Sequence, residues 1–207
     1  RCCVCPDRAQ LCPRGVQGHI RGAGGDFKAR GACPRGRPPA DRAALTACRT
    51  NAAKLKSLSG ERVRDELLKI LMVAQPAEAV RLMQAYGVLE QILPEAGEVT
   101  RLRLVNWLTT RGVLMEGLAA DPLRNLAALL DTDAVGASAV AGRLRLSNVQ
   151  TDRLVSLVAP AATPTPDQDT LDHEKLLRRI GPEIFRDLAI LGWAAEIEAA
   201  TRLPPQR

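Results

Sequence analysis

The sequence of 207 residues predicts an all-α protein, an irregular array of helices that follows a disordered N-terminal arm. From residue 40 onward, apolar residues recur at the three- and four-residue spacing of one helix face. Residues that start and stop helices divide this pattern into segments, and no segment alternates as a half-buried strand does. We expect about nine or ten helices, and their uneven spacing excludes a solenoid of repeats.

The arm at 1–39 shows neither helical nor strand periodicity and is rich in glycine, proline, arginine and cysteine. It holds too few large aliphatic residues to bury a core, which favours a disordered basic arm or a stretch translated out of frame. Five of the six cysteines lie here. Disulfides would need an oxidising compartment, and the arm has no apolar export signal. A zinc site would need paired Cys-x-x-Cys knuckles, which the spacing does not give.

Three helices are predicted between Asp41 and Gly87. Asp41 and Ser59 are good N-terminal caps for the first two, and Pro76 suits the first position of the third, which Gly87 ends. Each helix carries one apolar stripe: Leu45, Cys48, Ala52 and Leu55 in the first; Val63, Leu67, Ile70 and Leu71 in the second; Ala79, Leu82, Met83 and Tyr86 in the third.

The same start and stop signals continue along the rest of the chain. The further predicted helices are a turn at 88–93 before Pro94, a helix over 99–115, one opened by Asp121-Pro122, an alanine-rich one over 135–145, one capped by Ser147 and ended by Pro160, and two at 170–180 and 183–200. We therefore divide the chain into the arm, a helical neck and body at 40–159, a linker at 160–169 and a helical tail at 170–207.

The net charge of +6 comes from the arm rather than from the helical region. The first 50 residues hold ten basic and three acidic residues, and the remainder holds 19 and 20. Long-range attraction of nucleic acid by the helices should therefore be weak, and RNA binding there needs local patches. The scarcity of aromatic residues argues against a stacking platform of the RRM or OB type. No apolar run reaches the length of about 18 residues that a membrane span needs.

Two local patches of basic residues are the best candidates for RNA contacts. Lysines and arginines gather around the start of the second helix, and two arginines precede the cap Ser147. Phosphate contacts are expected from Lys54, Lys56, Arg62, Arg64, Arg143 and Arg145. The alternative is that these residues serve the fold, because Arg62 could pair with Glu66 one turn further on, and Arg64 and Lys69 with carboxylates of the same helix.

No catalytic or metal-binding residue stands out in the helical region. The paired carboxylates Asp131/Asp133 and Asp167/Asp169 lie between helices or cap one, whereas a strand would aim both at one Mg²⁺ ion. His173 lies early in a polar helix, where a solvated histidine is the simplest interpretation. We therefore predict no catalytic residue, no metal site and no cofactor in this chain.

The run 51–71 resembles the neck helix of bacterial class II CCA-adding tRNA nucleotidyltransferases and poly(A) polymerases. That family has Ser-x-Glu-Arg, then an apolar residue, then a Glu three positions further on. The matching residues here are Ser59, Glu61, Arg62, Val63 and Glu66. The segments 81–95, 143–148 and 180–194 are similar to the family's later helices, so the resemblance extends over three quarters of the chain.

The resemblance implies a template-free enzyme that restores C-C-A to tRNA 3′ ends from CTP and ATP with Mg²⁺. The family's catalytic head carries a Gly-Gly-x-x-Arg-Asp loop, a strand-borne Asp-x-Asp metal pair and a Glu-Asp-x-x-Arg helix, and no segment of this sequence matches that head. We therefore expect a neck, body and tail fragment that binds tRNA and adds no nucleotide by itself. CTP and ATP would be partners only if a head domain is present, and Glu61, Arg62 and Glu66 would then support the nucleotide pocket.

The alternative, from a different functional class, is a helical protein-interaction module with no RNA role. Under either hypothesis the chain is expected to be cytoplasmic, with no membrane partner. Salt-sensitive, phosphate-dependent tRNA binding distinguishes the two, because only contacts to the RNA backbone release counterions.

Overall fold

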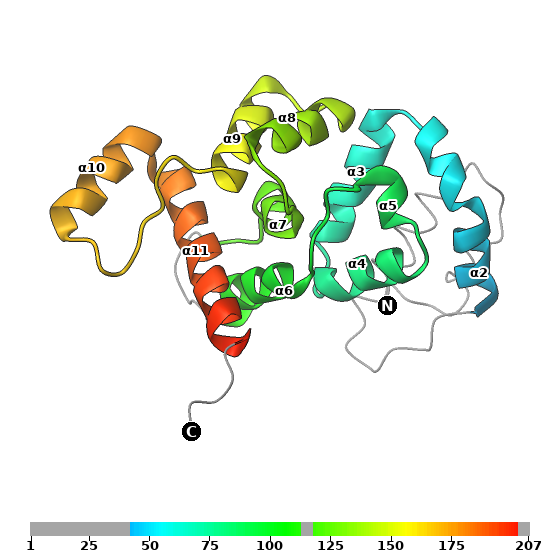
Figure 1. Cartoon of the computed structure of the whole chain (residues 1–207), viewed down its shortest axis with the longest axis horizontal. Helices are drawn as coiled ribbons and strands as arrows, with labels where there is room; N and C mark the ends of the chain where they lie inside the picture. The colour runs from blue at the N-terminus through cyan, green and yellow to red at the C-terminus, as the bar shows by residue number, and fades with distance from the viewer. Residues whose placement is uncertain (1–41, 113–117, 203–207) are drawn as a thin grey trace.

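The computed structural model of the chain describes residues 42–112 and 118–202, and within them the fold is all-α, as the sequence predicts (Figure 1). Ala96 and Leu130 form an isolated antiparallel bridge, and the described residues contain no strand. The arm at 1–39, with its zinc and disulfide alternatives, lies outside these residues. Of the helices described, none is both long and apolar enough to cross a membrane.

Ten α-helices, a 3-10 helix and a π-helix make up the regular structure of the described residues. In chain order they are α2 (Arg42–Asn51), the 3-10 helix η3 (Ala52–Ser57), α3 (Gly60–Leu71), α4 (Pro76–Ala85), α5 (Leu89–Ile92), α6 (Thr100–Trp107), the π-helix η4 (Leu108–Gly112), α7 (Pro122–Leu129), α8 (Ala134–Arg143), α9 (Asn148–Val158), α10 (Thr170–Ile180) and α11 (Pro182–Arg202). Residues 159–169 connect α9 to α10 without a helix.

The hydrophobic core lies where α3, α6 and α7 pack together, with α2 and α10 at opposite ends of the molecule (Figure 1). Leu67 and Leu71 of α3, Leu102 of α6 and Leu126 of α7 are almost completely buried there. Burial of each such leucine contributes about 1.5–3 kcal/mol. The apolar stripes that the sequence shows therefore do face one core.

Most of the predicted N-terminal caps are present. The carboxylates of Asp121 and Asp169 and the hydroxyl of Ser147 each accept a hydrogen bond from the backbone N–H three residues further on, and a reciprocal bond completes a capping box at Ser147. Ser59 is the N-cap residue of α3, as the sequence predicts, although its hydroxyl accepts no capping hydrogen bond.

The first predicted helix is two elements rather than one. α2 ends at Asn51, whose Nδ2 donates to the carbonyl oxygen of Ala47 (2.9 Å) and so occupies an acceptor of the last turn. The chain then tightens into η3, which still buries Leu55 as the sequence predicts. Cys48 of α2 is buried in the core and forms no disulfide within the described residues.

The helix predicted over 99–115 also changes character. It becomes the π-helix η4 at Leu108, where the hydroxyl of Thr109 donates to the carbonyl oxygen of Val105 (2.9 Å) and that of Thr110 to the carbonyl oxygen of Asn106 (2.7 Å). Such back-bonding competes with the α-helical ladder and widens the turn. The remainder of the predicted helix, beyond residue 112, lies outside the described residues.

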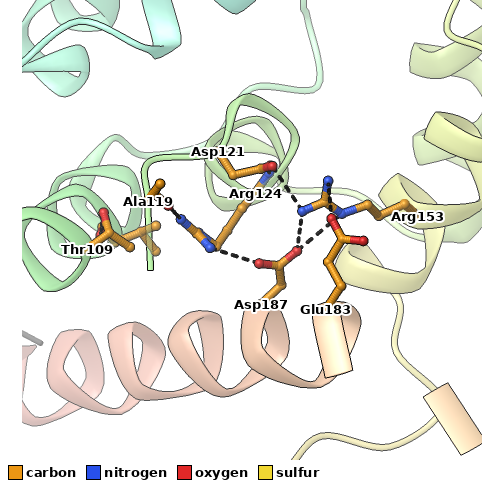
Figure 2. Close-up of polar contacts among 8 residues, drawn as sticks. Thr109, Ala119, Asp121, Arg124, Arg153, Glu183 and Asp187 are labelled. Atoms are coloured by element: carbon orange, nitrogen blue, oxygen red, sulfur yellow. Dashed lines mark hydrogen bonds and ion pairs between the residues drawn. The ribbon is translucent and has the colours of Figure 1, made fainter. Parts of the chain in front are cut away.

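A network of ion pairs joins α11 to α7 and α9 (Figure 2). Asp187 of α11 accepts from Arg124 Nη1 (2.9 Å) and from Arg153 Nε (3.2 Å), and the side chains of Arg124 and Asp187 are each 3% exposed. Arg153 also pairs with the carboxylates of Asp121 (3.1 Å) and Glu183 (3.2 Å). Burial alone would lower the pKa of Arg153, but the bonds and charges of Asp187 and Asp121 outweigh it and raise the pKa.

Candidate nucleic-acid interface

The start of α3 lies directly against the end of α8, more than 80 residues further along the chain. The contact requires a glycine: a Cβ added to Gly60 would lie 2.2 Å from the carbonyl oxygen of Arg143 and 3.1 Å from the side chain of Arg145. The two patches of basic residues that the sequence predicts separately therefore meet at one junction. We call Lys56, Arg62, Arg64, Arg143 and Arg145, which lie on or beside this junction, the basic cluster.

Arg64 connects the two helices. Its Nη1 donates to the carbonyl oxygen of Arg145 (2.7 Å), and its Nε donates to Asp65 Oδ1 (2.9 Å). Arg145 has a φ of 52°, in the left-handed region that residues other than glycine rarely adopt. This turn between α8 and α9 directs the carbonyl group toward Arg64 and leaves the Arg145 side chain exposed. Arg64 therefore positions the junction, and Arg145 offers its charge to solvent.

Arg143 is held by a carboxylate. Nη1 and Nη2 of Arg143 donate to the two oxygens of Glu95, the former at 3.0 Å, and Nε donates to the carbonyl oxygen of Ile92 (3.3 Å). Burial disfavours the charged form of Glu95, but the hydrogen bonds and charge of Arg143 outweigh this and lower the pKa of the Glu95 carboxyl. Arg143 therefore fastens the end of α8 to the segment after α5, and only part of its guanidinium remains available to a ligand.

The remaining cations differ in whether their side chains bind other residues of the protein. Lys56 and Arg62 are exposed and make no hydrogen bond or ion pair within the part of the chain that the structure describes. Lys54 stands apart from the junction and donates from Nζ to Asn51 Oδ1 (2.9 Å). The alternative pairing of Arg62 with Glu66 is wrong, because Glu66 binds Lys69 Nζ (3.0 Å).

A groove of about 380 Å³ runs beside the basic cluster, between η3, the start of α3, α5 and the end of α8. Its lining is largely aliphatic, with Leu55, Val63 and Leu144 among these residues, and also includes the cations Lys56 and Arg143 and one carboxylate, Glu90. No aromatic residue is among those that line it. The junction thus combines a largely apolar lining with cations, an arrangement that suits phosphate contacts better than base stacking.

The three residues predicted to support a nucleotide pocket lie on α3. Glu61 and Arg62 are exposed and Glu66 is half-buried, and none of them is among the residues that line the groove. A hydrogen bond from its own backbone N–H lowers the pKa of Glu61, against weak desolvation, and the Ser59 hydroxyl and the charges of Arg145 and Arg64 lower it further. Glu61 therefore stays ionised beside the basic cluster.

The paired carboxylates and the histidine have structural partners. Asp133 and Asp169 accept capping bonds from backbone N–H groups. His173 is half-buried, with Nε2 at 2.9 Å from the carbonyl oxygen of Thr165 and its ring edge-on to Phe185, so the prediction of a solvated histidine is wrong. The described residues contain no group of three side chains that could hold a metal ion.

Gly60 and Glu95 also determine how α3, α5 and α8 meet at the junction, and the sequence analysis does not identify either residue. Glu95 is 48 residues from Arg143, and no local pattern connects them. Gly60 gave a weak signal, because glycine is an unfavourable residue in the first turn of a helix unless close packing requires it. Both are consequences of how α3, α5 and α8 pack.

Residues 41–99 match a family model described as "Probable RNA and SrmB- binding site of polymerase A". No curated protein matches the chain. The matched segment contains Lys56, Arg62 and Arg64 of the basic cluster, together with Glu95, the partner of Arg143. Residues 41–99 are therefore similar to an RNA-binding region of polymerase A, which supports the poly(A) polymerase family broadly and RNA as the partner of this segment.

Proposed function

We propose that this chain is the tRNA-holding helical portion of a nucleotidyltransferase of the CCA-adding and poly(A) polymerase family. The observation that carries the proposal is the junction of α3 and α8, where basic side chains from three separate segments gather beside one groove. The match of residues 41–99 to an RNA-binding region supports the same assignment.

The exposed members of the basic cluster are the proposed phosphate contacts. Lys56, Arg62 and Arg145 are exposed, whereas Arg64 and Arg143 hold the junction in shape. The helical region carries almost no net charge, so a few close contacts would dominate its affinity for RNA. Contacts of this kind fix the position of an RNA backbone without reading its bases, as suits a protein that must hold every tRNA.

Nucleotide addition would require a further domain. Phosphoryl transfer depends on carboxylates that clamp Mg²⁺, and the described Asp-x-Asp carboxylates do not fit such a site because Asp133 and Asp169 cap helices. The chain alone is expected to incorporate no CMP or AMP into tRNA. CTP, ATP and Mg²⁺ would act only with a head domain, beside which Glu61, Arg62 and Glu66 would stand.

The decisive experiment compares two triple variants of the full chain in tRNA binding at several salt concentrations. Substituting Lys56, Arg62 and Arg145 by Gln should weaken binding and reduce the slope of log affinity against log salt by about three. The control substitutes the exposed α10 residues Lys175, Arg178 and Arg179 by Gln and removes the same charge. Both variants keep the basic arm, so its contribution cancels.

Equal losses in the two triple variants would contradict the proposal, because the effect would then follow net charge alone. Absence of any salt-dependent tRNA affinity would favour the protein-interaction module instead. Circular dichroism should be unchanged in both variants, since each substituted side chain is exposed.

A further inference from the structure

An aromatic side chain between two arginines lies on the exposed face of α6 and η4. Arg103, Trp107 and Arg111 follow one another at intervals of four residues, and all three are exposed. Trp107 leaves 50% of its surface in solvent, although it is the largest side chain of this segment. A spacing of four residues is about one turn, both in α6 and in the wider π-helical turn that carries Arg111, so the three side chains lie along one side of the segment.

The rest of the segment holds this stripe in place. Leu102, Val105 and Leu108 on the opposite face are completely buried in the core. Asn106 Nδ2 donates to the carbonyl oxygen of Ala74 (3.0 Å), which ties the last turn of α6 to the loop after α3. Trp107 is therefore presented on a rigid support, and a ligand that stacks on it need not order a loop.

The sequence around Trp107 is basic. The sequence between Glu98 and Glu116 contains three arginines and no acidic residue. Arg101 pairs with Glu198 (3.6 Å), but the side chains of Arg103 and Arg111 make no ion pair or hydrogen bond within residues 42–112 and 118–202. An exposed aromatic residue alone is ordinary, whereas an aromatic face between two unpaired guanidinium groups matches a base and its flanking phosphates.

We propose that Arg103, Trp107 and Arg111 form a second RNA contact, which stacks one unpaired base on Trp107 and holds the neighbouring phosphates with the arginines. The inference rests on RNA being the ligand of this chain, as proposed above, but it concerns residues beyond the matched segment 41–99. This contact would provide an aromatic surface for base stacking, which the basic cluster lacks because no aromatic residue lines its groove. The expected ligand is a single-stranded stretch of RNA, because a paired base cannot offer its face.

The two contacts lie at opposite ends of α3. The basic cluster adjoins Gly60, the first residue of this helix, and Asn106, the residue before Trp107, binds the loop that follows Leu71, its last. A helix of 12 residues is about 18 Å long. One RNA molecule could therefore touch both contacts only by extending along the molecule, so the two should contribute separately to affinity.

Trp193 provides an internal control. It is the second tryptophan of the chain and is 47% exposed, nearly as much as Trp107. Its groove is lined by Pro164, Phe185 and Glu196 rather than by arginine. His173 also lines this groove, but no lysine or arginine does. A stacked base there would meet the Glu196 carboxylate without a guanidinium group beside it, so RNA should distinguish the two tryptophans.

The experiment measures tryptophan fluorescence of the full chain during titration with a single-stranded oligoribonucleotide. In Trp193→Phe the only emitter is Trp107, and its fluorescence should be quenched as RNA binds; in Trp107→Phe the only emitter is Trp193, and its fluorescence should change little. Trp107→Ala should weaken binding of the oligonucleotide about fivefold or more, while Trp193→Ala should not. Arg103→Gln and Arg111→Gln should each reduce the salt slope by about one.

Affinity for a duplex of the same length should be insensitive to Trp107→Ala, because stacking requires an unpaired base. Quenching of Trp193 alone, or unchanged affinity in Trp107→Ala, would overturn the inference. The proposed function would survive that result if the substitutions at Lys56, Arg62 and Arg145 still weakened tRNA binding. Loss of all RNA binding by the unaltered chain would overturn both.

Discussion

Two arginine-containing regions of this chain use the same side chain in opposite ways. In the ion-pair network of α7, α9 and α11, Arg124 and Arg153 face the carboxylates of Asp121, Glu183 and Asp187 (Figure 2). In the basic cluster at the junction of α3 and α8, cations outnumber carboxylates, and Lys56, Arg62 and Arg145 are exposed. The first region uses guanidinium groups to fix the tail helix α11 on the core, and the second leaves them open to a polyanion.

The difference shows that burial and the number of available carboxylates decide what an arginine does. A buried guanidinium must be paired, because an isolated charge away from water is strongly unfavourable. An exposed one is hydrated and adds little to stability whether or not it is paired. Arg143, paired with Glu95 but 39% exposed, lies between these two cases. Substitutions in the two regions should therefore separate stability from RNA affinity.

The largest effect is expected at Asp187. Asp187→Asn would leave Arg124, whose side chain is 3% exposed, without its carboxylate, and should reduce the free energy of unfolding by about 3–5 kcal/mol. Urea unfolding followed by circular dichroism measures this loss.

The matched control is Glu183→Gln, since that carboxylate is 70% exposed and also pairs with Arg153. This variant should lose below about 1 kcal/mol of unfolding free energy. RNA affinity per folded molecule should be unchanged in both variants, and a similar cost for the two would contradict the distinction between the regions.

A smaller effect is expected where α3 meets α8. Gly60→Ala would place a Cβ against the carbonyl oxygen of Arg143 and should cost about 1–3 kcal/mol of unfolding free energy, with weaker tRNA binding because the junction opens. Gly142→Ala is the control: nothing lies within 4 Å of a Cβ there, and alanine in the helix should stabilise the chain by about 0.5–1 kcal/mol. Unfolding free energy and tRNA affinity are measured for both. If Gly60→Ala lost stability but kept its affinity for tRNA, the junction would not shape the RNA contact.

The smallest effect concerns Glu95, whose pKa is below its ordinary value of 4.5. A carboxyl with a lowered pKa in the folded chain contributes stability above pH 4.5, and this contribution is lost as the pH falls further through the lowered pKa. Glu95→Gln should cost below about 1 kcal/mol at neutral pH and make the acid decline in stability shallower. Thermal unfolding across this pH range tests both effects, with Glu90→Gln, an exposed carboxylate of the neighbouring α5, as control. A decline as steep as in the unaltered chain would mean that Glu95 gains nothing from Arg143.

The helices and most of their caps could be predicted from the sequence because they depend on residues a few positions apart. Asp121 and Asp169 cap helices through N–H groups three residues away, and the apolar stripe of α3 reads directly from its spacing. Ser59 also occupies the N-cap position of α3, but its hydroxyl makes no capping bond, and helix propensity does not decide which hydrogen bond a short polar side chain makes.

The candidate interface could be predicted only in part. The sequence identifies the basic residues of the interface. It does not show which of their side chains are exposed and which are bound within the protein, because this depends on distant partners such as Glu95 and the carbonyl group of Arg145. The sequence contains Arg103, Trp107 and Arg111 at intervals of four residues. The scarcity of aromatic residues nevertheless argues against a surface that stacks bases, so this stripe is not predicted. Exposure of Trp107 is a property of packing and not of spacing.

The backbone of Arg145 has an evolutionary consequence. At a φ of 52°, glycine or asparagine would occupy the same turn with less steric cost, and its carbonyl group would still accept the bond from Arg64. Keeping an arginine at this φ costs conformational stability, so substitutions that stabilise the protein are expected at this position first. Its replacement would raise the stability measured in an assay of folding and, on the proposed function, would lower the affinity for RNA. If Arg145 contacts RNA as proposed, this gain in stability would be neutral for function only in a chain that no longer binds RNA.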